Sequence, residues 1–180
     1  FDAEQNQKIV RKAIQYRDRG VVGIDLAGTE TRTIELSDAV DQYAAIFAEA
    51  RDAGLGTTIH TGETQATSGE GVIAVVKKLK PHRIGHGIRA AYSDEAMRLL
   101  AETDTVLEVC PTSNLHTRAV EQLGEFDFIL NTFLDRGVPF TINTDGTYLC
   151  NTNLRREFDI LESANILTPD QLETARKRAF

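Results

Sequence analysis

Three short polar segments each follow a run of apolar residues, and each carries a side chain able to do chemistry: His60-Thr61-Gly62-Glu63, Gly85-His86-Gly87 and Asn143-Thr144-Asp145. Imidazole and carboxylate groups are common zinc ligands, and a catalytic zinc site combines three protein ligands with a water molecule. A further carboxyl group beside such a site can move a proton to a substrate nitrogen. Together the three segments predict one metal-centred site.

Each of these residues also has a purely structural interpretation. His60 alone could be a hydrogen-bonded loop residue, His86 could belong to a simple turn between two glycines, and Asp145 could cap the following helix. Glu63, three residues after His60, favours the metal site because it supplies the carboxyl group for proton transfer. In that setting His86 is a candidate for orienting the metal-bound water.

The remaining candidates carry weaker signals. His82 precedes its predicted strand, so we expect a structural role, whereas His116 follows a strand and leaves a substrate contact open. Cys110 ends a strand without a second thiol nearby, which is typical of a small buried residue. Ser113 has no evident base beside it, which disfavours a serine nucleophile.

Composition places the chain among soluble globular proteins. Its 180 residues are 41% hydrophobic and 26% charged, and a chain of this length buries roughly 70% of its unfolded surface. A net charge of -7 without any basic patch disfavours a nucleic-acid partner, and no apolar run is long enough for a membrane span, so we expect neither nucleic acid nor a membrane as partner. Two cysteines make no disulfide framework, so we expect a cytoplasmic protein. Because the chain begins at Phe1 without a methionine, we expect a piece of a longer protein or a processed product.

Apolar strands and amphipathic helices alternate along the chain. We predict strands at 21–26, 56–60, 83–85, 105–109 and 138–142, and helices at 2–19, from Ser37 or Asp38 to 53, at 69–79, from 93 onward, and at 125–136, 152–164 and 169–179. Short apolar strands joined by helical crossovers indicate parallel βαβ units. We expect a single domain over residues 1–180.

Two α/β architectures fit this order of elements. A doubly wound sheet usually places a G-x-G-x-x-G turn after an early strand, and Leu26-Ala27-Gly28-Thr29-Glu30 lacks it. A (β/α)₈ barrel collects functional residues at the carboxyl ends of several strands, which is the pattern here. Five strands cannot close an eight-stranded barrel, so we predict the carboxyl-terminal five β/α units of a TIM-type barrel. Its open strand edges favour self-association or pairing with the missing half.

Five segments together resemble the adenosine deaminase family of metal-dependent hydrolases. They cover nearly the whole chain in the family's order: Gly23-Ile24-Asp25-Leu26-Ala27-Gly28, Ile59-His60-Thr61-Gly62-Glu63, Arg83-Ile84-Gly85-His86-Gly87, Glu108-Val109-Cys110-Pro111-Thr112-Ser113-Asn114 and Ile142-Asn143-Thr144-Asp145. The resemblance implies a barrel with one zinc ion that deaminates adenosine, a small purine nucleoside, to inosine and ammonia.

The resemblance also implies roles for individual residues. It maps His60 and Asp145 onto zinc ligands, which also places Asp145 among the catalytic groups. Glu63 maps onto the acid that protonates purine N1, and His86 onto the residue that positions the attacking water and stabilises its charge. Gly28 maps onto a backbone contact to the purine.

The chain departs from the family pattern in two places. It lacks the family's His-x-His pair, so two further zinc ligands are expected from a missing amino-terminal strand, and we expect the isolated chain to be inactive. Gly146 follows Asp145 where the family usually has a second Asp that contacts the purine, so Gly146 is a candidate substrate-binding position. The substrate therefore stays open among adenosine, adenine, a modified adenosine and an aminofutalosine-type nucleoside. A non-catalytic half-barrel is the remaining alternative.

Overall fold

A five-stranded parallel sheet forms the centre of the computed structural model, which describes residues 2–28 and 40–179. The strands are β1 (Gly23–Leu26), β2 (Gly56–Thr61), β3 (Arg83–His86), β4 (Val106–Val109) and β5 (Phe140–Ile142). They lie side by side in chain order, and every neighbouring pair is parallel. A doubly wound sheet would reverse its strand order at a switch point, so this topology favours a barrel wall.

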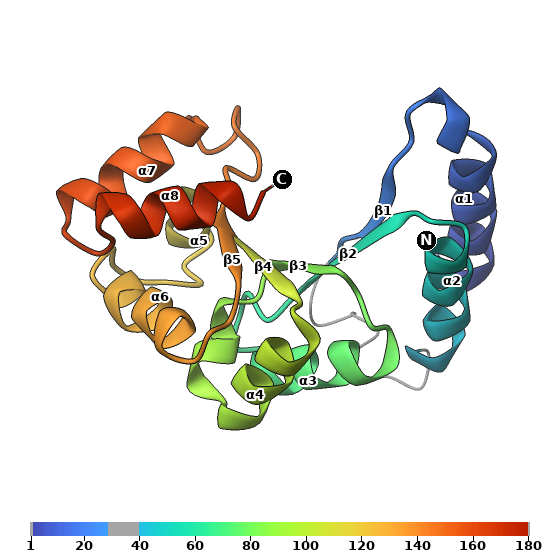
Figure 1. Cartoon of the computed structure of the whole chain (residues 1–180), viewed down its shortest axis with the longest axis horizontal. Helices are drawn as coiled ribbons and strands as arrows, with labels where there is room; N and C mark the ends of the chain where they lie inside the picture. Colours follow the sequence, from blue (N-terminus) through green and yellow to red (C-terminus); the bar gives the residue numbers. More distant parts are fainter. Residues whose placement is uncertain (1, 29–39, 180) are drawn as a thin grey trace.

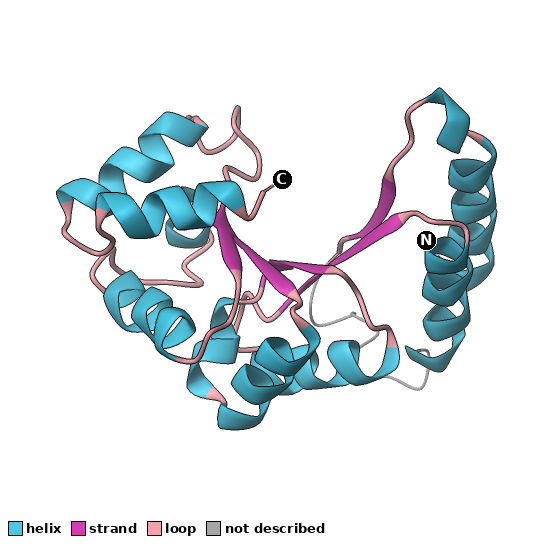
Figure 2. Ribbon diagram, viewed as in Figure 1, coloured by secondary structure: helices cyan, strands magenta, loops and turns pink. Residues whose placement is uncertain are grey.

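The helices form an arc outside the sheet, and the arc is open between β1 and β5 (Figures 1 and 2). They are α1 (Ala3–Gln15), α2 (Val40–Asp52), α3 (Ser68–Lys78), α4 (Asp94–Thr103), α5 (Pro111–His116), α6 (Glu125–Asp135), α7 (Leu154–Ser163) and α8 (Pro169–Lys177), with 3₁₀ turns η1 (Arg17–Arg19) and η4 (Ile88–Tyr92). Ser37 and Asp38, the predicted start of the second helix, lie outside the described residues. The partial (β/α)₈ architecture is confirmed.

Local capping explains where several helices begin. Ser93 accepts a hydrogen bond from the Ala96 N–H at the start of α4, and Thr168 forms a capping box with Gln171 at the start of α8. Two details differ from the prediction. The helix expected over 2–19 ends at Gln15 and continues as the turn η1, and the short helix α5 after β4 was not among the predicted helices.

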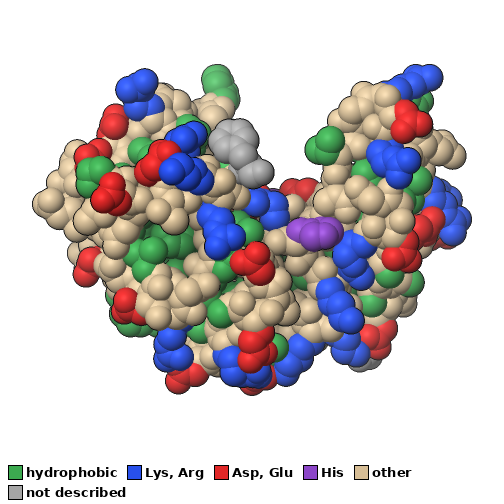
Figure 3. All heavy atoms as spheres, viewed as in Figure 1, with side chains coloured by type: hydrophobic (Ala, Val, Ile, Leu, Met, Phe, Trp, Pro, Cys, Tyr) green, Lys and Arg blue, Asp and Glu red, His purple; other side chains and the backbone are tan. Residues whose placement is uncertain are grey.

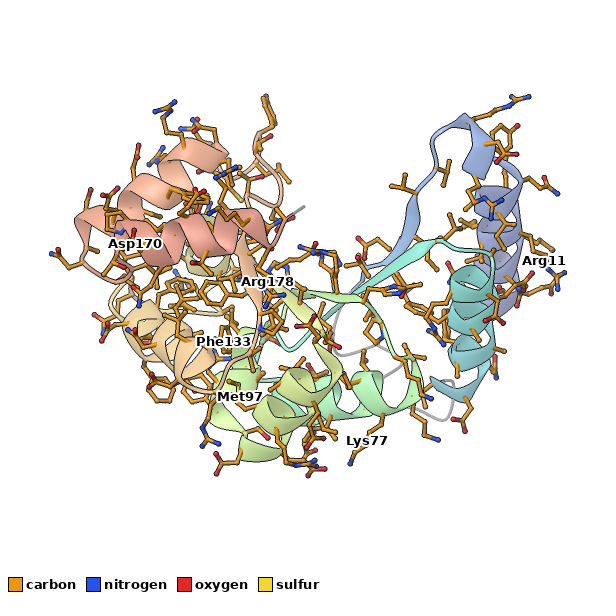
Figure 4. The ribbon with its side chains drawn as sticks, in the orientation of Figure 1. Arg11, Lys77, Met97, Phe133, Asp170 and Arg178 are labelled. Atoms are coloured by element: carbon orange, nitrogen blue, oxygen red, sulfur yellow. The ribbon has the colours of Figure 1, made fainter. Side chains whose placement is uncertain are left out.

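The two faces of the sheet differ in chemistry. Ile59, Ile84 and Leu107 are buried on the face that packs against the helices, where Met97 and Phe133 also lie (Figure 4). The opposite face carries charge: Arg83 Nε donates to Glu108 Oε1 at 2.6 Å. Barrel interiors are usually filled with branched apolar side chains, so this charged face is a departure from that pattern. Figure 3 shows the molecule hollowed between the two arms of the arc.

Membrane-spanning helices are absent from residues 2–28 and 40–179, since none of the helices there is long and apolar enough to cross a bilayer.

Candidate active site

The predicted polar side chains meet at the carboxyl end of the sheet. His60 lies near the end of β2, His86 is the last residue of β3, and Glu63 and Asp145 follow β2 and β5. The parallel register pairs His60 with Gly85 and Thr61 with His86, and it sets the two imidazole rings 5.3 Å apart in an edge-to-face arrangement. The convergence of these side chains therefore follows directly from strand pairing.

The backbone leaves two of these strand ends in an uncommon conformation. His86 has φ +63° and Asp145 has φ +54°, both in the left-handed region that residues other than glycine adopt infrequently. Such strain persists where the surrounding structure requires it, and it clusters at functional sites. Here the two residues lie at the end of β3 and three residues after the end of β5, where the polar side chains meet.

The His60 ring contacts a carboxylate and occupies the space that Gly85 leaves by having no side chain. Its Nδ1 lies 3.1 Å from Asp25 Oδ1, and this hydrogen bond is the main cause that raises the pKa of His60, with further help from the Asp145 charge. Gly85 makes room for the ring, because a Cβ there would lie 2.9 Å from three ring atoms. The Asp25 contact places the neutral ring's proton on Nδ1 and leaves Nε2 as a potential metal ligand.

The buried side-chain amide of Asn114 contacts both Glu63 and His86. Glu63 Oε2 lies 3.6 Å from His86 Nε2, and Glu63 Oε1 accepts hydrogen bonds from Asn114 Nδ2 at 3.2 Å and from Thr117 Oγ1 at 2.8 Å. Asn114 Nδ2 also lies 3.1 Å from His86 Nδ1. Because His86 is only 3% exposed, this arrangement fixes a carboxylate and an imidazole beside each other at a sheltered place.

The helix α5 supports the other side of the site. Ser113 Oγ donates to Asp145 Oδ2 at 2.7 Å. The first turn of α5 is anchored by Glu157 of α7, a fully buried carboxylate that accepts from the Thr112 N–H at 3.0 Å and from the Thr152 hydroxyl. Glu157 thus connects α7 to the helix that presents Ser113 and Asn114, and its carboxylate accepts a backbone N–H in the first turn of that helix.

Several carboxylates lie near the carboxyl end of the sheet. The pKa of the Cys110 thiol is raised well above its usual range, first by burial and then by four surrounding carboxylates, those of Asp145, Glu108, Glu157 and Glu63. Such a concentration of carboxylates favours a bound cation. His60 Nε2 and the Asp145 carboxylate suit zinc, yet within the two described ranges no group of three or more His, Cys, Asp or Glu side chains is placed to hold an ion. The donor set therefore fits part of a zinc site.

The other candidate residues lie as follows. Gly28 lies two residues after the end of β1, with no atom within 4 Å of where a Cβ would stand, and Gly146 follows Asp145 and lies near Leu149. His82 lies at the opposite end of the sheet, where its Nδ1 accepts from the Thr57 N–H at 3.1 Å, as expected for a structural histidine. His116 is exposed at the end of α5.

Three partners were not assigned a role from the sequence: Asp25, Asn114 and Glu157. A signal existed for Asp25, because a carboxylate inside the apolar run Val21–Leu26 needs a partner. Asn114 stood after a predicted strand, in one of the segments that carry the resemblance, but its contacts with Glu63 and His86, 51 and 28 residues away, could not be read from the sequence. Nothing in the sequence pattern pointed to Glu157, which binds the Thr112 N–H 45 residues away.

Comparison with known proteins identifies close similarity to one family. A family model described as adenosine deaminase matches residues 2–180. The chain is 40% identical to an aminodeoxyfutalosine deaminase of Acidothermus cellulolyticus over 164 residues, which are 88% of this chain and 44% of the relative. It is 38% identical to an adenosine deaminase of Clostridium botulinum over 154 residues, which are 86% of this chain and 43% of that relative.

The fold is also shared with a solved structure. An amidohydrolase from Burkholderia ambifaria with bound zinc superimposes with a TM-score of 0.82 at 24% identity, over 99% of this chain and 48% of that one. The chain thus spans about half the length of the curated relatives it matches.

Proposed function

The chain belongs to the adenosine deaminase family, and on that premise we propose that it carries the acid–base part of a zinc-dependent site that hydrolyses the 6-amino group of an aminopurine nucleoside. The observation that supports this proposal is the buried contact set of Glu63, Asn114 and His86 next to His60 and Asp145. The site is completed only when the arc of strands is closed by complementary strands, so self-association and pairing with such a half are both expected of the isolated chain.

The reaction assigns the proton transfer to Glu63 and the stabilisation of charge to His86. Water adds through its oxygen to purine C6, and Glu63 takes one proton from that water and carries it to N1. The water's second proton passes to the amino nitrogen, the bond between C6 and that nitrogen breaks as ammonia leaves, and the C6 oxygen is left as a carbonyl. His86 orients the water and stabilises the charge that develops there. Asn114 and Thr117 hold the Glu63 carboxylate in place for this transfer. Gly28 and Gly146 border the purine, Gly28 through its backbone.

The proposed metal ligands in this chain are His60, through Nε2, and Asp145. Zinc supplies the chemistry of lowering the pKa of a water molecule toward ~7, which provides hydroxide near neutral pH. Two further histidines are proposed to come from the complementary strands. Asp25 keeps the His60 ring in the tautomer that exposes Nε2, and Ser113 orients the Asp145 carboxylate, which are the supports that metal ligands commonly need.

Two nucleosides are the candidate substrates. Adenosine is the first. An aminodeoxyfutalosine-type nucleoside is the second, because the relative that is 40% identical to this chain is named an aminodeoxyfutalosine deaminase. Adenine and modified adenosines would share the same chemistry at C6. Gly146 has no side chain to contact the purine beside Asp145, which differs from the family pattern. All of these substrates therefore have to be tested.

A rebuilt barrel provides the test. Residues 1–180 would be joined to the part of the Acidothermus relative that this chain does not match, and zinc content and ammonia release would be measured with adenosine, aminodeoxyfutalosine and adenine. We expect about one zinc per chain and turnover of a nucleoside, with both lost in a His60→Ala control. A folded, zinc-loaded protein that deaminates none of the three would contradict the proposal, and full turnover by residues 1–180 alone would contradict the need for complementary strands.

A further inference from the structure

Asn114 lies between two side chains of the proposed reaction, and its amide is fully buried. Its Nδ2 is 3.2 Å from Glu63 Oε1 and 3.1 Å from His86 Nδ1, whereas its Oδ1 is buried without a hydrogen-bond partner. A side-chain amide has two N–H donors and one carbonyl acceptor. The structure therefore uses both donors and leaves the acceptor unpaired, which is an unusual arrangement for a buried group.

The carboxylate of Glu63 determines which way this amide points. Exchanging the oxygen and nitrogen of Asn114 would set a carbonyl oxygen against Glu63 Oε1, and an ionised carboxylate has only acceptors to offer. Thr117 Oγ1 donates to the same oxygen at 2.8 Å, as expected if Oε1 is an acceptor. The amide nitrogen must therefore face Glu63, and its second N–H then faces His86.

This orientation has a consequence for the imidazole. A neutral histidine carries one N–H and one lone pair, and the nitrogen that accepts a hydrogen bond is the one without the proton. We propose that Asn114 is a positioning residue that sets the tautomer of His86: by donating to Nδ1, it fixes the ring N–H on Nε2, the nitrogen that faces Glu63 Oε2 at 3.6 Å.

The tautomer decides what His86 can do in the reaction, and this part of the inference rests on the proposed function. With its proton on Nε2, the neutral ring can donate a hydrogen bond toward the water and the charge that forms at C6. It cannot accept the water's proton through that same nitrogen. Proton transfer to the purine is then left to Glu63, while His86 acts as a hydrogen-bond donor rather than as a general base.

The role of the amide is separable from the role of the backbone at this position. The Asn114 N–H donates to the Cys110 carbonyl at 2.9 Å, and the Asn114 carbonyl accepts from the Val120 N–H at 3.1 Å. These bonds hold α5 and its exit, and they survive a change of side chain. A purely structural Asn114 would alter stability when replaced, but it would leave the position of the His86 proton unchanged.

The test is ¹⁵N NMR of the histidine rings in the full chain, recorded at increasing pH until the ring signals stop changing, because the ordinary histidine pKa is ~6.5 and that of His60 is raised by its bond to Asp25. The protein has four histidines, and two provide opposite references within the same spectrum. His82 accepts at Nδ1 from a backbone N–H and must carry its proton on Nε2, while His60 faces a carboxylate through Nδ1. We expect His86 to show the pattern of His82 and the opposite of His60.

Three variants sharpen the measurement. Asn114→Asp replaces the donor by an acceptor and is expected to move the His86 proton to Nδ1, and Asn114→Leu is expected to give a mixture of tautomers. Thr117→Val is the matched control, because it removes a donor to Glu63 without touching His86, and should leave the His86 tautomer unchanged.

Two results would overturn the inference. One is a wild-type His86 with its proton on Nδ1. The other is an unchanged His86 tautomer in both Asn114 variants while His60 and His82 keep their native signals. If the variants do not fold, the wild-type spectrum still decides. The measurement needs neither metal nor substrate, so absence of deaminase activity in the rebuilt barrel would count against the proposed function and not against this tautomer.

Discussion

Replacing Gly85 by alanine is expected to displace the His60 ring from its place beside Asp25. The new Cβ would stand 2.9 Å from Cγ, Cδ2 and Nδ1 of the ring. Non-bonded carbon atoms prefer a separation of about 3.5–4.0 Å, so the ring has to move by roughly 0.6–1 Å. The Nδ1 to Oδ1 distance is already 3.1 Å, and hydrogen bonds of this type extend to only about 3.2 Å. Because Gly85 lies on β3 and Asp25 on β1, on the two sides of β2, a shift of that size crowds the ring against the β1 side and disturbs the alignment of this bond.

The assay follows the pKa of His60 by NMR. In the native chain this pKa is raised, mainly by the hydrogen bond to Asp25, while burial acts in the opposite direction. We expect Gly85→Ala to lower the pKa toward the ordinary histidine value of ~6.5. Gly124→Ala is the control, since no atom lies within 4 Å of where its Cβ would stand. A raised pKa of His60 that persists in a folded Gly85→Ala protein would refute the reasoning.

Three further predictions concern the supports of the site. Glu157→Ala should lower the free energy of unfolding by roughly 3 kcal/mol in urea titrations, because hydrogen bonds to a buried charge contribute about 1.5–3 kcal/mol and the Thr112 N–H loses its acceptor. Glu157→Gln should lower it by less, and equal stability of the native chain and both variants would contradict this. The Cys110 thiol, whose pKa is raised, should resist disulfide reagents at about pH 8 until the protein unfolds, and rapid labelling of the native chain would contradict its burial. The pKa of His60 is raised in the folded chain, so the pair with Asp25 stabilises the fold fully below the unfolded pKa of ~6.5, and this stability is lost as pH rises through the folded pKa. The midpoint of urea unfolding should therefore fall over this pH range in the native chain and should not fall in this way in Asp25→Asn, and identical pH profiles of the two proteins would argue against the pair.

The architecture could be predicted from the sequence because its signals are local. Apolar runs that end in polar residues marked the strands, and the helix predicted from residue 169 begins at Pro169. The order of these elements indicated parallel βαβ units, and the resemblance to the adenosine deaminase family is confirmed over residues 2–180. The short helix α5 was not predicted, although Pro111 stands in its first turn, and the carboxylate that accepts the Thr112 N–H there lies 45 residues away in the chain.

The site could be predicted in outline only. Parallel strands bring their carboxyl ends to one edge of a sheet, so the convergence of His60, Glu63 and His86 followed from their places after strands. Their hydrogen-bond partners depend on register and on packing between distant segments. Asn114 reaches Glu63 across 51 residues, and no periodicity of the sequence encodes that contact. The zinc ligands and the roles of the site residues remain predictions.

The rate of ammonia release by the rebuilt barrel, compared between the wild-type protein and its Glu63→Gln variant, tests the central claim most directly. Glu63 is proposed to carry a proton to the purine and is not a proposed zinc ligand. We therefore expect unchanged zinc content and a rate lower by about 10²–10⁴-fold, the usual contribution of a general acid. Equal rates for the two proteins, at equal zinc content, would contradict the account.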